Sequence, residues 1–323
     1  MTPDLPPALR AAIDAQLEGV ARGDLALRAQ RTSQAYRAGK PSSGVIRDAA
    51  DALAYALTRL PATYAASVTV LAEAARMTPG FRPASLLDAG AGTGAASWAA
   101  ETVWPGLEVV DWVDASPPFL ALASSLAAGG PAPLRTATAT RADLTDMADL
   151  PAADLVVASY ALAEIAPGRQ LGVIAGLWAA ARGLLVMVEP GTPAGYSRML
   201  SARDALIAAG ANILAPCPHH SACPLAGADW CHFSVRLPRS RDHRQAKGAD
   251  VPFEDERFAY LIAARSHLEA LARAPRILAP PRAGKPGIDL KLCGEAGVEQ
   301  RFVGRRDKPA HARARRLGWG DTF

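Results

Sequence analysis

Four cysteines are the residues whose type and spacing most clearly indicate chemistry in this 323-residue chain. Three fall within fifteen residues, and the complete set is Cys217, Cys223, Cys231 and Cys293. Four thiolates form the ligand set of a tetrahedral zinc site or of a cubane iron–sulfur cluster. The grouping of thiols in one polar segment therefore predicts a metal site.

The spacing of the cysteines leaves the metal open. It reads Cys-x5-Cys-x7-Cys followed by a 61-residue gap, without the paired Cys-x2-Cys knuckles of zinc ribbons. Prolines directly after two of the cysteines suit a cubane cluster, whereas three histidines nearby would favour zinc: His219, His220 and His232. Because the fourth cysteine is distant in sequence, the site would attach the C-terminal region to the rest of the chain and contribute to folding.

A glycine-rich loop is the second feature that could do chemistry. Residues 88–94 read Asp-Ala-Gly-Ala-Gly-Thr-Gly and stand between an apolar strand-like run and a helical pattern. Glycines at Gly90, Gly92 and Gly94 let the backbone turn tightly and bring the N–H groups of a helix start close to a ligand. The Gly-x-Gly-x-Gly spacing after Asp88 resembles the first motif of S-adenosylmethionine (SAM) dependent methyltransferases, and a plain tight turn is the alternative.

Two further acidic residues fit a nucleotide-like cofactor. Asp114 ends the next predicted strand, where a carboxylate can accept both ribose hydroxyls; Asp111 takes that place if the strand ends sooner. Asp143 stands where methyltransferases often place a contact to the adenine amine, and it could equally cap a helix. The cofactor-binding prediction is therefore Asp88, Gly90, Gly92, Gly94, Asp114 and Asp143.

The methyl-acceptor side is less marked. The stretch 159–164, Ser-Tyr-Ala-Leu-Ala-Glu, follows the fourth predicted strand at the sheet edge where substrates bind. It lacks the Asn/Asp-Pro-Pro-aromatic signature of amino-directed nucleic-acid methyltransferases, and no cysteine lies there for attack on a pyrimidine. Glu164 and Glu189 are the candidate polar groups, and either could instead cap or orient a helix.

The surrounding pattern predicts an α/β fold with three regions. Residues 1–80 show only helical spacing, at 5–22 and 43–77, with Pro61 marking the start of a new helix. Alternating strands and helices from residue 84 predict a parallel, Rossmann-like sheet covered on both faces. The expected regions are a helical extension at 1–80, a SAM-binding domain at 81–215, and a cysteine-rich basic region at 216–323 that completes the sheet.

The composition indicates the class of protein and the cellular compartment in which we expect it. Half of the residues are hydrophobic, yet no apolar run reaches the roughly 18 residues of a membrane span. The first residues lack a secretory signal, so we expect a cytoplasmic protein without membrane contact. In that compartment clustered cysteines more often bind metal than form disulfides.

The charge is unevenly distributed. Residues 1–231 hold 16 Lys and Arg against 20 Asp and Glu, whereas residues 232–323 hold 19 against 11. A net +8 at one end suggests a polyanionic partner such as RNA, with a solvated surface as the alternative.

Together these segments resemble one family, the mitochondrial small-ribosomal-subunit assembly factors of methyltransferase-like type, with bacterial relatives. The shared segments are 59–64, 87–94, 159–164, 188–193, the motifs around the first three cysteines, 230–234 and 285–287. We expect the chain to be monomeric off the ribosome. The resemblance implies a 4Fe–4S cluster on the four cysteines and attachment to the small subunit. It leaves open an rRNA methyltransferase or a non-catalytic assembly factor. A small-molecule methyltransferase with structural zinc is the third alternative.

Overall fold

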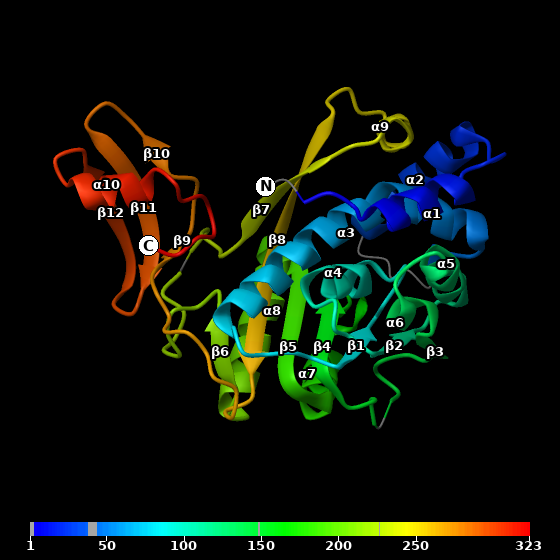
Figure 1. The fold of residues 1–323 in the computed structure, drawn as a ribbon, viewed down its shortest axis with the longest axis horizontal. Helices are drawn as coiled ribbons and strands as arrows, with labels where there is room; N and C mark the ends of the chain where they lie inside the picture. Colours follow the sequence, from blue (N-terminus) through cyan, green and yellow to red (C-terminus); the bar gives the residue numbers. More distant parts are fainter. Residues whose placement is uncertain (1–2, 38–43, 148, 226) are drawn as a thin grey trace.

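The computed structural model describes residues 3–37, 44–147, 149–225 and 227–323. A central eight-stranded sheet has the order β3-β2-β1-β4-β5-β8-β6, and β7 pairs with the free length of β8 (Figure 1). The strands of its parallel part are β1 (Ser85–Ala89), β2 (Val109–Asp114), β3 (Thr138–Arg141), β4 (Ala153–Ser159) and β5 (Ala181–Pro190). The predicted α/β, Rossmann-like class is confirmed.

Helices cover both faces of the parallel strands, which explains why β4 and β5 are apolar along almost their whole length. The helices are α4 (Ala95–Val103), α5 (Pro117–Ala127), α6 (Ala132–Arg135), α7 (Pro167–Ala180) and α8 (Pro193–Ala208). One core joins α4 and α5 to the N-terminal helices, and a second core packs α7 and α8 on the opposite face. The sheet therefore packs between two apolar layers of helices, and the loops at the ends of its strands lie outside these layers.

The antiparallel end of the sheet contains β6 (Asn212–Ala215), β7 (Phe233–Pro238), α9 (Arg241–Lys247) and β8 (Phe253–Ala264). Strand β8 lies between β5 and β6 and pairs antiparallel with both. In the sequence, the apolar run of this strand begins only at residue 258, after four charged residues. The first half of β8 extends past the ends of β5 and β6 and pairs there with β7, from Phe233 opposite Phe258 to Pro238 opposite Phe253.

Three helices precede the sheet: α1 (Pro7–Gln16), α2 (Arg22–Arg37) and α3 (Ala49–Met77). The predicted helix over 5–22 is wrong in its length, since Gly19 at φ 72° separates α1 from α2. The predicted break at Pro61 is also wrong, because α3 continues through it. Burial on the cores repays the lost hydrogen bond there, which costs about 3 kcal/mol.

The C-terminal segment forms a small second sheet of β9 (Arg276–Ile277), β10 (Arg282–Ala283), β11 (Gly287–Gly294) and β12 (Gly297–Gly304), followed by α10 (Lys308–Ala314). It has its own apolar core and stands to one side of the main sheet (Figure 1). The cysteine segment lies between the two sheets. Within the described ranges, no helix is long and apolar enough to cross a membrane.

Candidate functional site

The glycine loop turns from β1 into α4 through three residues of positive φ: Gly90, Gly92 and Gly94. Gly90 faces the loop after β4, where a Cβ would come within 2.6 Å of the Ala161 Cβ. Around Gly92 a Cβ would meet no atom within 4 Å. The loop is therefore packed from one side and open at Gly92, the side from which a ligand can reach its backbone.

Asp88 braces this loop from behind. Its Oδ2 accepts hydrogen bonds from the Ser97 backbone N–H (3.1 Å) and hydroxyl (2.6 Å), while the Trp112 indole donates to the same hydroxyl (2.9 Å). These contacts tie β1, α4 and β2 together. Its Oδ1 is buried and has no partner among the residues that the structure describes, and burial raises the pKa of Asp88 to about 6. The chain thus leaves one acceptor unused beside the loop.

Asp114 lies at the end of β2 and fixes the same loop. Its Oδ2 accepts from the Gly92 N–H at 2.8 Å, and its Oδ1 accepts from the Ser116 N–H at 2.7 Å. Each carboxylate oxygen keeps further acceptor capacity. Asp111, the alternative, pairs with Thr138 within the sheet. Asp143 is exposed and accepts from both the N–H and the hydroxyl of Thr145 at 2.8 Å, so it caps a turn.

The loop after β4 is strained where it passes the glycines. Tyr160 has a backbone φ of 60°, which residues other than glycine seldom adopt. Backbone strain of this kind clusters at functional sites. The exposed Glu164 ends the 3-10 turn η2 (Leu162–Glu164) that follows. Glu189 is buried on β5, accepting from the Ala163 N–H (3.2 Å) and from Arg198 Nε (2.6 Å). Glu189 therefore orients this loop.

A cleft of about 1340 Å³ opens above the carboxyl ends of β4 and β5. Its walls come from α2, α3, the turn after β4, the start of α8, and the α9 hairpin, which consists of β7, α9 and β8. Both Tyr160 and Glu164 line the cleft. Ligands of open α/β sheets bind at this edge. Tyr55 of α3 lines the cleft and packs its ring against Phe119 of α5, with centroids 4.8 Å apart. The cleft therefore adjoins the region around Asp114.

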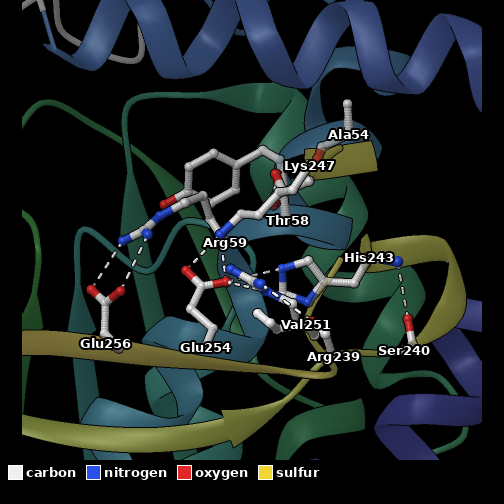
Figure 2. A network of polar contacts seen from close by, with 11 residues as sticks. Ala54, Thr58, Arg59, Arg239, Ser240, His243, Lys247, Val251, Glu254 and Glu256 are labelled. Carbon is white, nitrogen blue, oxygen red and sulfur yellow. Dashed lines mark hydrogen bonds and ion pairs between the residues drawn. The ribbon is translucent and has the colours of Figure 1, made fainter. Parts of the chain in front are cut away.

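A buried ion pair holds Tyr160 in the cleft wall. Glu256 of β8 accepts from both guanidinium nitrogens of Arg59 (3.3 and 3.2 Å) and from the Tyr160 hydroxyl (2.8 Å). Burial alone would lower the pKa of Arg59, but the Glu256 carboxylate raises it, so the guanidinium stays charged. Burial, reinforced by Glu256, raises the pKa of Tyr160 well above 10, which keeps the phenol a donor. Figure 2 shows this pair beside α3.

A second cluster fixes the α9 hairpin against β8. Glu254 accepts from Lys247 (2.6 Å) and Arg239 (3.1 Å) and lies 3.4 Å from His243 Nε2 (Figure 2). Burial tends to raise the pKa of Glu254, but these donors hold it well below its usual range. Sequence reasoning missed both clusters. The signal was present, because Glu254 and Glu256 alternate in a strand and so share one face.

The four predicted metal ligands line one small, largely apolar cavity of about 40 Å³. The chain thus brings Cys293 of β11 to the three cysteines that precede β7. In the part of the chain that the structure describes, however, no three His, Cys, Asp or Glu side chains are grouped so as to hold a metal ion. Burial raises the pKa of Cys293 to about 11 and that of Cys231 well above its usual value, and the neighbouring cysteines add to both shifts.

Tyr196 and Arg203 line this cavity together with His219 and Tyr260, and Arg276 lies near its thiols. The Tyr196 hydroxyl lies 3.2 Å from the Cys223 sulfur. Arg203 is buried, interacts with the Cys217 thiol, and donates to the carbonyls of His219 and Ser221 at 3.0 and 2.7 Å. Among the described residues its Nε has no hydrogen-bond partner. Buried Arg276 binds the Pro216 carbonyl and Glu73. Positive charge and an unused donor therefore face the thiols.

Four arginines of the basic C-terminal region are at the surface. Arg305, Arg306, Arg315 and Arg316 are all exposed around the second sheet. Across the described ranges none of the four forms an ion pair, whereas Arg301 pairs with Glu299 and Lys291 with Asp229. The unpaired guanidinium groups are available to an anionic partner.

Comparison with curated proteins gives two relatives. The chain is 30% identical over 291 residues to human "Ribosome assembly protein METTL17, mitochondrial", covering 84% of this chain and 62% of that protein. It is 26% identical over 324 residues to the Schizosaccharomyces pombe "Rsm22-cox11 tandem protein 2, mitochondrial", covering 84% of this chain and 43% of the relative. It therefore spans less than two thirds of the length of either.

Among solved structures, magnesium protoporphyrin IX methyltransferase from Synechocystis with bound SAH gives a TM-score of 0.39 at 16% identity. This match covers 63% of this chain and 82% of that one. The family model for mitochondrial small ribosomal subunit Rsm22 matches residues 49–323. As that match covers all but the first helices, this protein belongs to the Rsm22 family.

Proposed function

We propose that this protein binds SAM at the glycine loop and acts on the small ribosomal subunit during its assembly. Membership of the Rsm22 family supports the ribosomal part, as does the similarity to a human protein named for ribosome assembly. The observation that carries the SAM part is the open backbone at Gly92, held in place by the carboxylate of Asp114.

The residues around the loop fit SAM. Asp114 keeps acceptor capacity for the two ribose hydroxyls while its backbone bonds fix its position. The unpartnered Oδ1 of Asp88 is the kind of buried acceptor that a bound ligand satisfies. Asp143 stays a proposed adenine contact. Bound SAM would supply an electrophilic methyl group, and the cleft beside Tyr160 and Glu164 would hold the acceptor.

The cysteine cavity fits a metal centre by the chemistry of its donors. Four thiols surround it, and the free Nε of Arg203 can donate to a metal-bound sulfur. Arg276 adds positive charge against the negative charge of a tetrathiolate site. One water needs roughly 10–15 Å³ of such space, so a 40 Å³ cavity has room for more than a single atom. This supports a 4Fe–4S cluster, with zinc as the alternative, linking the two sheets.

The rRNA partner is proposed for the basic surface around the second sheet. Its unpaired arginines can neutralise phosphates, so affinity should fall steeply as salt rises. A complex insensitive to salt would count against phosphate contacts by these arginines.

The experiment that tests the proposal is tritiated methyl transfer from SAM to small subunits from cells lacking this gene, with protein prepared without oxygen. Label in rRNA would make the protein a methyltransferase and allow the modified nucleotide to be mapped. Binding to the particles without label would make it an assembly factor that uses the fold for binding. A protein that ignores both SAM and the particles would refute the proposal.

A further inference from the structure

The second sheet carries an aromatic ring that is largely exposed to solvent. Phe302 of β12 is 54% exposed although it is a large apolar residue on a regular strand. The core of this sheet lies on the other face, where Ile288, Leu290 and Leu292 pack. The Phe302 side chain therefore projects on the face that the small core does not use.

Two glycines form the floor under this ring. Gly287 of β11 and Gly304 of β12 are direct partners in the antiparallel register, two residues beyond the pair of Asp289 and Phe302 and on the same face. A Cβ added at Gly287 would lie 2.7 Å from the Phe302 Cζ, and one added at Gly304 would lie 3.5 Å from its Cε1. The ring thus lies down over bare backbone and leaves its other side open.

Three cationic residues lie on the strands and the turn next to Phe302. Arg282 of β10 is opposite Asp289, which is itself opposite Phe302. At the glycine end, the Arg305 N–H donates to the Pro286 carbonyl at 3.1 Å, which brings Arg305 next to the turn that holds Lys285. All three cations are exposed and, within the described chain, form no ion pair. An aromatic face among unpaired cations matches an unpaired base with its phosphates.

We infer that Phe302 is a stacking platform for an unpaired base of single-stranded RNA, with Lys285, Arg282 and Arg305 holding the flanking phosphates. The inference rests on the proposed association with rRNA and names the form of RNA that is bound. Asp289 offers an acceptor for an exocyclic amino group of the stacked base. A duplex cannot bind in this way, since its bases are already stacked on one another.

The test uses the full-length protein with its metal, a short fluorescent single-stranded RNA, and the same sequence as a duplex. Phe302→Ala should weaken single-strand binding by about 5- to 150-fold, the equivalent of one stacked base. Phe302→Tyr should retain it. The slope of log affinity against log salt should not change, because stacking releases no counterions. Arg305→Gln should reduce that slope by about 0.7.

A matched control and three outcomes complete the test. Leu171→Ala removes an exposed apolar side chain on α7 and should change neither affinity nor slope. If wild-type protein binds RNA with a salt-dependent affinity that Phe302→Ala leaves unchanged, the platform is refuted while the proposed rRNA association stands. If Phe302→Ala instead loses binding to a ribosomal protein, the surface is a protein-docking site and the inference is wrong. Wild-type protein that binds no RNA would refute the proposed association itself.

Discussion

The buried pair of Arg59 and Glu256 allows a quantitative prediction. Glu256→Ala would leave a guanidinium without its carboxylate and the Tyr160 hydroxyl without its acceptor. Breaking a buried pair from one side costs about 3–5 kcal/mol. Arg59 keeps 32% of its side chain exposed, so water recovers part of the loss and we expect about 3 kcal/mol. A double-mutant cycle that combines Glu256→Ala with Arg59→Met should give a coupling free energy of about 1–2 kcal/mol.

The neighbouring residue on β8 supplies the control. Asp255 pairs with Arg236 at 2.7 and 2.8 Å, shorter distances than those of the Arg59 pair, but both side chains are exposed. Solvent screening should hold that coupling to about 0.5 kcal/mol. Free energies of unfolding come from urea titrations followed by tryptophan fluorescence. A surface coupling equal to the buried one would refute the argument that burial, rather than bond length, gives the pair its strength.

Three further predictions concern the loop, the buried carboxyl and the thiols. Gly92→Arg should abolish SAM binding in calorimetry while lowering stability by about 1–2 kcal/mol, whereas Gly19→Arg, at a similar positive φ in open space, should keep SAM binding. Burial raises the pKa of Glu189 from 4.5 to about 7, so the folded state binds the proton more tightly. Stability should therefore fall by about 3 kcal/mol as pH rises through that window, and Glu189→Gln should remove this part of the slope in urea titrations across pH; an unchanged slope would contradict it. Cys231→Ser should lose metal and the brown chromophore, while the control Tyr196→Phe should keep both. If metal analysis finds an unchanged metal content in Cys231→Ser, Cys231 is not a ligand.

The sequence was sufficient for the parts of the fold that depend on local pattern. Alternating strands and helices, the glycine turn and the acidic end of β2 are short-range signals, and each is present as predicted. The gathering of Cys293 with the other three cysteines is a longer-range prediction; all four line one cavity, but no three of the described side chains are grouped so as to hold a metal ion. Their identity as ligands stays a prediction.

The rest depends on pairings between distant segments. The first half of β8 reads as charged, and Glu256 is buried because of contacts with distant residues, among them Arg59, which is 197 residues away. Pro61 predicts a break from local chemistry alone, whereas packing on both sides keeps α3 continuous. The cleft is likewise formed by α2 and the α9 hairpin, whose approach no local pattern encodes.

The position of β8 between β5 and β6 has a consequence for synthesis of the chain. Strand β6 ends at Ala215, but the strand that joins it to the sheet ends only at Ala264, about 50 residues later. At 5–20 residues per second, translation takes roughly 2.5–10 s to cover that distance. During this interval the nascent sheet has an open edge at β5, which is prone to wrong pairing. Cys293 is made later still, so any group that needs all four thiols is acquired after the sheet can close.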